Sequence, residues 1–417
     1  MEQAKTDESL LGKRLYLARK QKSLTLRDLS SKTGLSHTQI HRIEKGATQT
    51  KTSAMKQLLE VLDVAFNRDP FHEEAFYKNF HELFYQVLYV NYESAKEIFN
   101  SLYQKRDIYE NSRCFMDYHL IMLMVVVHTG YRKDLMEHFY QACEAMKDFY
   151  EPSKREWFEV MKTIYLKRQF KQKEALEHTE RLLEIVRDDH FRGILNYSRG
   201  TILIMDYLHY FDAIEALEKA QKLFEDNLNF NRSNRAKAVK QRVYIYLFRF
   251  DEFRESFKES ESYAKKNGVL DLYYFIHINK ALYHIFDEDY EAALKILDTF
   301  EFPSPFYYMS KVFSCYKLKH DTEAKKTIEK FKSSGAPFVT TLEERFYKLM
   351  IHGLENGEDE VYLDMLKDFT DDALSERNFP KFKQGVSLLT KLLEKRRLYK
   401  EAYHYSNTLL SILETIQ

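Results

Sequence analysis

Hydrophobic residues recur at helical spacing along almost the whole chain. Between residues 10 and 65, four short segments carry apolar residues three or four positions apart, bounded by capping residues or glycines. From residue 68 to 417 the same spacing continues with few breaks. Only 11 Gly and 6 Pro occur among 417 residues, too few for the turns of a β-sandwich or an α/β enzyme. The pattern predicts an all-α protein, with a small N-terminal helical domain followed by a long helical array.

In the N-terminal domain, capping residues and glycines mark where four helices begin and end. The expected helices are Leu11–Lys22, a helix after Thr25, a helix after Ser36 that ends at Gly46, and Ser53–Leu62. Thr25 and Ser36 each precede, by three residues, a side chain that can complete a capping box (Asp28 and Gln39). Gly34 can adopt the left-handed conformation that ends a helix. Two short helices joined by such a turn predict a helix-turn-helix, whose second helix enters the major groove of DNA.

The expected recognition helix presents one apolar side and one polar side. Ile40 and Ile43 are spaced to face inward. Gln39 suits adenine and Arg42 suits guanine, while hydroxyl groups suit phosphates. We predict these DNA-binding residues at this helix: Ser36, His37, Thr38, Gln39, His41 and Arg42. The alternative for each is an ordinary solvent-exposed side chain.

Charge is divided unevenly although the whole chain has a net charge of zero. Residues 12–56 contain eleven basic and two acidic side chains, a net of +9, so the remainder is acidic. A basic head on an acidic body favours contact with double-stranded operator DNA through the head alone. The predicted domains are 1–66 (helix-turn-helix), 67–90 (linker helix region) and 91–417 (helical repeats, about nine helix pairs).

A repeat of about 40 residues runs through the body. Each copy has an aromatic residue, two polar residues, a small residue and an apolar residue; the small positions are 95, 134, 175, 213, 256, 293, 324, 362 and 402. The period is somewhat longer than the roughly 34 residues of a tetratricopeptide (TPR) repeat. Breaks are expected at Gly268, Pro303, Pro305, Gly335, Pro337 and Gly357. Stacked helix pairs form a superhelix whose concave face suits an extended peptide, although such an array can also serve only as a scaffold.

Strong hydrogen-bonding residues occupy one phase of this repeat. Eleven residues before the aromatic residue of three successive copies stand Arg199, Arg242 and Asn279. Arg can pair with a carboxylate, and Asn can hold a peptide backbone at both N–H and C=O. Residues 228–250 add six basic and no acidic side chains. We predict these peptide-binding residues: Arg192, Asn196, Arg199, Arg235, Arg242 and Asn279; the alternative is that they cap helices or face water.

The head resembles the Xre/phage-repressor helix-turn-helix family, through the string LGKRLYLARKQKSLTLRDLSSKTGLSHTQIHRIEKG. The resemblance implies a buried ion pair between Arg19 and Glu44, so these two residues are expected to be structural. Members of the family commonly carry Gln at the second position of their second helix, where it contacts the DNA backbone. Here that position is Leu26, and Thr25 or Arg27 would have to replace the contact.

The same head followed by a TPR-like array resembles the peptide-pheromone receptors of Gram-positive bacteria and their phages, the group of the Rgg, PlcR, NprR and Rap proteins. Residues 190–300 look most like the arbitrium receptors (AimR) of temperate phages, through HFRGILNYSRGTIL and EDNLNFNRSNRAKAVKQRVYIY. The resemblance implies a regulator that senses a short signalling peptide and, in the arbitrium case, sets lysis against lysogeny. The alternatives are a chromosomal quorum-sensing regulator of the PlcR/NprR type or a Rap-like protein that binds a response regulator through the helix containing Gln86.

Several kinds of chemistry are not indicated. Cys114, Cys143 and Cys315 are widely spaced, so no disulfide framework or zinc site is expected, and no cofactor or metal is expected either. No catalytic motif is present, and we expect no enzymatic activity. A polar N-terminus and short apolar runs predict a cytoplasmic protein without membrane spans. A single helix-turn-helix covers one half-site, so we expect a homodimer, held by the leucine-rich C-terminal repeats.

Overall fold

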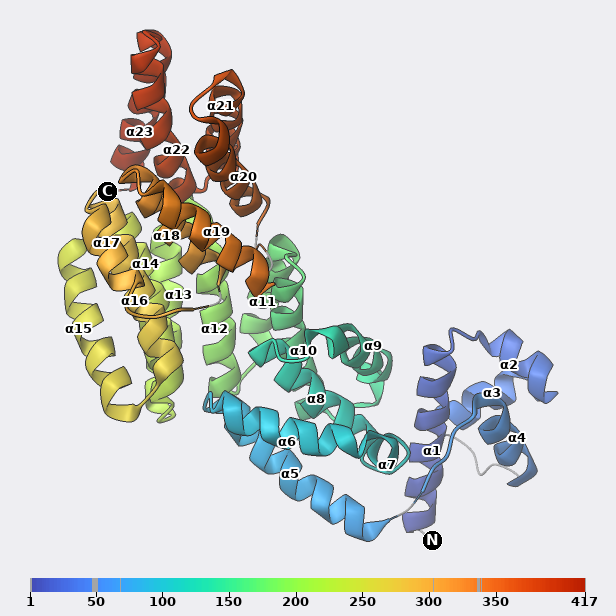
Figure 1. The fold of residues 1–417 in the computed structure, drawn as a ribbon. Coiled ribbons are helices and arrows are strands. Elements are labelled where there is room, and N and C mark those ends of the chain that lie inside the picture. The colour runs from blue at the N-terminus through green and yellow to red at the C-terminus, as the bar shows by residue number, and fades with distance from the viewer. Residues whose placement is uncertain are drawn as a thin grey trace. The chain divides into compact units, whose positions relative to one another are not determined.

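The computed structural model describes residues 2–46, 52–67, 69–302, 304–335, 338 and 340–416, and helices make up nearly all of this part of the chain (Figure 1). The all-α prediction is confirmed, since no strand occurs among these residues. The chain divides into two compact units, Met1–His178 and Thr179–Gln417. Tertiary packing thus groups the N-terminal head with the first helix pairs of the body. The predicted domain limits at residues 66 and 90 stay a prediction.

Four helices form the head of the first unit. They are α1 (Glu2–Gln21), α2 (Leu26–Thr33), α3 (His37–Glu44) and α4 (Thr52–Leu62). Their shared core contains Leu15, Ala18, Leu29, Ile40, Ile43, Leu58, Leu62 and Val64. The predicted start of the first helix at Leu11 was wrong, because α1 begins at Glu2. The earlier turns have few apolar residues and instead carry Asp7, which forms an ion pair with Arg113.

The rest of the first unit surrounds one fully buried helix. Its elements are α5 (Pro70–Leu88), α6 (Tyr92–Gln104), α7 (Arg106–Glu110), α8 (Phe115–Thr129), η1 (Lys133–Leu135), α9 (Met136–Met146), η2 (Lys147–Phe149) and α10 (Pro152–Arg168). All residues of α8 from Phe115 to Val127 are buried, because α5, α6, α7, α9 and α10 all contact it. A helix that is apolar all round is expected to be buried in this way. The longest apolar run of the chain is therefore a core helix.

The second unit is an array of helix pairs. Helix α11 (Gln172–Ile185) crosses the boundary, and the pairs are α12 (Asp189–Leu203) with α13 (Tyr210–Asp226), α14 (Phe230–Tyr246) with α15 (Phe250–Asn267), α16 (Leu270–Phe286) with α17 (Tyr290–Leu297), α18 (Pro305–Lys317) with α19 (Asp321–Ser334), α20 (Thr341–Asn356) with α21 (Glu360–Ser375), and α22 (Phe379–Lys395) with α23 (Tyr399–Ile416). A short η3 (Tyr207–His209) precedes α13. The first helices α14, α16, α18 and α20 contact one another in sequence. They therefore form a continuous layer of the solenoid.

The positions predicted for the small residue of the repeat are buried, with one exception. Eight of the nine positions are buried: Ala95, Ala175, Ala213, Ser256, Ala293, Ala324, Tyr362 and Ala402. Each lies in the first turns of the second helix of a pair. The copy assigned to Asp134 was wrong. This carboxylate is exposed in η1 and pairs with Arg132 at 2.8 Å, while α9 begins two residues later.

The turns inside the pairs explain why the chain needs so few glycines. In six pairs, the residue two positions before the second helix is not Gly yet has a positive φ: Val90, Phe170, Phe248, Glu288, Lys319 and Arg397. The left-handed conformation costs such residues about 1–2 kcal/mol each. Gly268 and Gly335 end α15 and α19 in the same conformation, as predicted, and Pro305 opens α18. Pro303 and Pro337 lie outside the described residues.

Hydrophobic length gives no sign of a membrane span. Within the described ranges, no helix combines the length and the apolar character needed to cross a bilayer.

Candidate functional site

Both predicted capping boxes are present and shape the helix-turn-helix. The Thr25 hydroxyl accepts a hydrogen bond from the Asp28 N–H at 3.1 Å, and the Asp28 carboxylate accepts one from the Thr25 N–H at 2.8 Å. Ser36 and Gln39 repeat the exchange at the start of α3. Gly34 ends α2 with a φ of +72°. These local bonds fix where α2 ends and where α3 begins.

The ion pair implied by the family resemblance is confirmed. Arg19 donates from Nε to Glu44 Oε1 at 2.6 Å and from Nη2 to Glu44 Oε2 at 2.7 Å, and both side chains are buried. Its Nη1 donates to the Leu24 carbonyl at 2.9 Å. The hydrogen bonds to Glu44 raise the pKa of Arg19 above its usual value. Arg19 therefore ties α1 to α3 and to the turn before α2.

Helices α1 and α3 also touch through a glycine. A Cβ added at Gly12 would lie 2.0 Å from the Ile43 carbonyl oxygen, inside van der Waals contact. No side chain larger than hydrogen fits there without moving one helix. The orientation of α3 therefore depends on this close approach as well as on the Arg19–Glu44 pair.

The outer face of α3 carries the side chains predicted to contact DNA. Ile40 and Ile43 are buried, whereas His37, Thr38, Gln39, His41 and Arg42 are exposed. Gln39 uses part of its hydrogen-bonding capacity within the protein, because its Oε1 accepts from the Ser36 N–H at 3.0 Å. Thr25 likewise bonds Asp28, and exposed Arg27 lines a depression beside α1 with Lys20 and Ser23. Contact of these residues with DNA stays a prediction.

The six predicted peptide-binding residues separate into two groups. Four belong to local interactions near the start of the second unit. Arg192 pairs with Asp189 at 3.6 Å, and Arg199 pairs with Glu180 at 3.5 Å. Arg235 pairs with Asp271 across neighbouring first helices, and Asn196 Nδ2 donates to the Arg192 carbonyl at 2.9 Å. Each of the four thus has a partner within the protein, and peptide binding by these residues stays a prediction.

The other two, Arg242 and Asn279, are brought together. Arg242 Nε donates to Asn279 Oδ1 at 2.8 Å, and Asn279 Nδ2 donates to the Ala238 carbonyl at 2.7 Å. The Arg242 guanidinium lies 4.3 Å from the ring centre of Phe275 and 4.6 Å from that of Phe306. Burial lowers the pKa of Arg242. The charge is thus held mainly by a neutral amide and two aromatic faces.

Further cations that the sequence did not single out surround this part of the second unit. Glu343 attracts both Arg242 and Lys381, and Lys381 lies 4.6 Å from the ring centre of Phe346. Burial lowers the pKa of Lys381 and Lys383, and lowers that of Lys317 to about 8. These lysines come from helices far apart in the sequence, so no motif links them.

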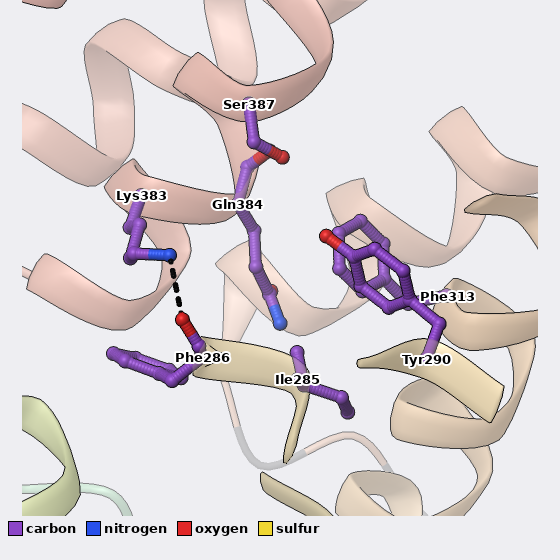
Figure 2. A pocket seen from close by; sticks show the side chains of 7 residues that line it. All are labelled: Ile285, Phe286, Tyr290, Phe313, Lys383, Gln384 and Ser387. Carbon is purple, nitrogen blue, oxygen red and sulfur yellow. Dashed lines mark hydrogen bonds between the residues drawn. The ribbon is translucent and has the colours of Figure 1, made fainter. Parts of the chain in front are cut away.

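A small pocket lies beside Lys383 (Figure 2). It is lined by Ile285, Phe286, Tyr290, Phe313, Lys383, Gln384 and Ser387. Figure 2 shows Lys383 reaching from α22 to the Phe286 carbonyl, at 3.3 Å, while Gln384 points between Phe286 and the Tyr290–Phe313 pair. Its volume of about 10 Å³ holds about one water molecule, so it is a gap between helices and not a peptide-sized site. Sequence reasoning placed the candidate groove at residues 192–279 and did not single out these lining residues.

These features define a helix-turn-helix protein with a TPR-like α-solenoid. Residues 12–67 match the model of a helix-turn-helix domain. No curated protein matches the sequence.

Most of the fold has solved counterparts among peptide-pheromone receptors, as the resemblance implied. A Rap protein complexed with Competence and Sporulation Factor superposes with a TM-score of 0.62 at 14% identity, covering 82% of this chain and 99% of that one. The Rap conjugation gene regulator of plasmid pLS20, in complex with the Phr* peptide, gives 0.52 at 13% identity over 82% and 97%. The apo form of the quorum sensor NprR from B. thuringiensis gives 0.50 at 14% identity over 82% and 99%.

Proposed function

We propose that this protein is a peptide-responsive transcriptional regulator. Its head binds operator DNA through α3, and its second unit binds a short signalling peptide along the first helices of the solenoid. The observation that carries the proposal is the pairing, in one chain, of a fully capped helix-turn-helix with the half-buried Arg242, whose guanidinium donates to the neutral amide of Asn279. Side chains, and not the fold alone, therefore support both DNA binding by the head and ligand binding by the second unit.

The chemistry around Arg242 favours an anionic group on the peptide. Arg242, Lys317, Lys381 and Lys383 outnumber the nearby carboxylates of Asp287, Glu288 and Glu343, and burial disfavours the charged form of all four. A ligand carboxylate would restore part of the solvation that these groups lost, because charge-assisted hydrogen bonds are the strong ones. The solved relatives bound to Competence and Sporulation Factor and to the Phr* peptide support a peptide as the ligand.

The direct test joins two measurements on the same purified protein. Calorimetry against peptides of five to eight residues would identify a ligand, and a gel shift with operator fragments selected from genomic DNA would show its effect on DNA binding. We expect one peptide class to bind and to change operator affinity. A protein that binds DNA but responds to no peptide in either assay would contradict the receptor role.

Within this group we propose the arbitrium type, in which the free protein holds its operator and the peptide weakens that grip, moving a phage toward lysogeny. The strings at residues 190–300 that look like arbitrium receptors support this choice. The sign of the peptide effect in the gel shift separates it from an activator of the PlcR type. Tighter DNA binding with peptide would contradict the arbitrium reading while leaving the receptor role intact.

We also propose that the active form is a homodimer joined by the C-terminal helices. The apolar residues of the leucine-rich C-terminal repeats divide into two groups: Leu389, Leu392, Leu393 and Ile412 are buried within the unit, whereas Leu410 is 58% exposed. Tyr399 and Tyr403 on the same helix are 61% and 71% exposed. The terminal helix α23 therefore keeps apolar surface that its own unit does not cover. Light scattering should show a monomer for the Tyr403→Glu/Leu410→Glu variant, and an unchanged dimer would refute this placement.

A further inference from the structure

Three side chains that can bind a metal converge in the first unit and belong to neither candidate site. Glu110 ends α7, His119 lies in α8 and His138 lies in α9. One ligand atom from each lies within 4.8 Å of the other two. Their positions in the sequence form no metal-binding motif, because three different helices supply them. Sequence reasoning expected no metal for that reason.

His119 has the geometry of a preformed ligand. It is 2% exposed, and its Nδ1 lies 2.7 Å from the Phe115 carbonyl oxygen, which can only accept a hydrogen bond. Nδ1 therefore carries the proton, and Nε2 carries the lone pair. This buried Nε2 has no hydrogen-bond partner and lies 4.0 Å from Glu110 Oε1. A histidine whose other nitrogen donates to a backbone carbonyl is the usual arrangement around a bound metal.

We propose that Glu110, His119 and His138 bind a divalent transition-metal ion of the Zn²⁺ class. Two imidazole nitrogens and one carboxylate oxygen are a ligand set that Zn²⁺ accepts, with a fourth position left open to water. Tetrahedral ligands about 2.1 Å from the metal lie roughly 3.4 Å apart. The observed spacing therefore requires the three groups to close slightly. Glu110 is half-buried and His138 is exposed, so both can move toward the fixed ring of His119.

The site adjoins the contact between the head and the helix pairs within the first unit. Arg14 on α1 donates from Nε to the Glu110 carbonyl at 2.6 Å and from Nη2 to Asn111 Oδ1 at 3.2 Å. Its charge attracts the Glu110 carboxylate and opposes a second cation, so we expect weaker affinity than at a four-ligand structural zinc site. A bound metal would link α7, α8 and α9 at Glu110, whose carbonyl accepts a hydrogen bond from Arg14 on α1. The metal should therefore stabilise this unit.

Cobalt gives a readout that does not depend on DNA or peptide activity. Tag-free full-length protein, freed of metal with a chelator, would be titrated with Co²⁺ and followed by its visible absorption, and then with Zn²⁺ in competition. We expect saturation at one equivalent, displacement by Zn²⁺ and a higher melting temperature with Zn²⁺. His138→Gln and Glu110→Gln should lose tight binding, and both side chains are accessible enough for the variants to fold.

The matched control is His404→Gln, which removes an exposed histidine from α23. It should bind Co²⁺ like the wild-type protein. Loss of the absorption bands in His138→Gln but not in His404→Gln supports the site. Equal binding by these two variants, or no saturable binding by the wild-type protein, overturns it.

Discussion

The head contains a buried arginine, Arg19, and the second unit a half-buried one, Arg242, and the two have opposite surroundings. Arg19 makes two hydrogen bonds to the Glu44 carboxylate and one to a backbone carbonyl, and its pKa is raised by Glu44. Arg242 has a neutral amide and two aromatic rings as its close partners, and burial lowers its pKa. The Arg19 guanidinium has a counter-charge within the fold. Burial of the Arg242 guanidinium costs solvation free energy, which a ligand anion could offset.

This difference separates a structural residue from a candidate receptor residue. Both arginines lie at positions with few breakers nearby and both belong to basic segments, so charge and spacing do not tell them apart. The partner does. A carboxylate supplied by the chain makes an arginine part of the core, and a missing carboxylate leaves it available to a ligand.

The largest effect is expected from breaking the ion pair between Arg19 and Glu44. Glu44→Ala leaves Arg19 buried without its counter-charge and should destabilise the head by about 3–5 kcal/mol. Chemical denaturation followed by hydrogen exchange in α1–α4 would measure the loss, with Lys20→Ala, an exposed neighbour, as the control. The double variant Arg19→Met/Glu44→Leu should recover most of the stability. An unaffected head in Glu44→Ala would remove the structural role from this pair.

Arg42, an exposed arginine of the head, provides a third environment for comparison with Arg19 and Arg242. Arg42→Ala should weaken operator binding by about 1–3 kcal/mol and leave the fold unchanged, because its guanidinium is in solvent. Gln39 needs a finer comparison, since its side chain also caps α3. Gln39→Glu keeps a capping acceptor but loses the amide donor, whereas Gln39→Ala loses both. Footprints of all three variants identical to the wild type would show that α3 does not read DNA.

Removing the arginine of the second unit should affect the ligand more than the fold. Arg242→Ala should lower peptide affinity at least tenfold, about 1.4 kcal/mol, with a loss of about 1 kcal/mol in stability from the orphaned Asn279 oxygen. Operator binding without peptide should persist. Arg254→Ala on α15, an exposed arginine paired with Asp251, is the control. Calorimetry and gel shift on both variants decide the matter, and unchanged peptide affinity in Arg242→Ala would refute its role.

The lysines near the pocket predict a pH dependence. Burial lowers the pKa of Lys317 to about 8, against 10.5 for the free side chain. As pH rises through 8 the folded protein loses this charge, and affinity for an anionic peptide should fall by up to tenfold per pH unit. Between pH 8 and 10.5 the unfolded chain binds more protons at this group, so its contribution to stability rises with pH. Calorimetry at pH 7 and 9 should show both trends flattened in Lys317→Met.

The smallest effect concerns the turns, where the second unit stores strain that a glycine would release. Lys319 is exposed with a φ of +60°, so Lys319→Gly should stabilise the protein by about 0.5–1 kcal/mol. Lys326→Gly, at an exposed site inside α19, should instead destabilise by about 1 kcal/mol. Thermal unfolding of the two variants provides the comparison. Destabilisation by Lys319→Gly would mean that the left-handed turn carries no strain.

Local signals explain why the head was predicted well. The capping boxes at Thr25 and Ser36, the left-handed Gly34 and the inward positions of Ile40 and Ile43 each depend on residues within one or two helical turns. The repeat was readable for the same reason, because a small residue recurs wherever a second helix must approach its partner. The sequence by itself determined the all-α class, the helix-turn-helix and the phase of the helix pairs.

Tertiary structure decided which polar residues meet. Lys383 reaches the carbonyl of Phe286, which is 97 residues away, and Arg242 lies against Phe306 on a helix two further along the layer of first helices. Glu110, His119 and His138 converge from three helices whose spacing matches no motif. Repeat periodicity fixes the face on which a side chain lies, but superhelical pitch sets its neighbours across the array. That pitch is the sum of many packing contacts between helices, and no local pattern in the chain encodes it.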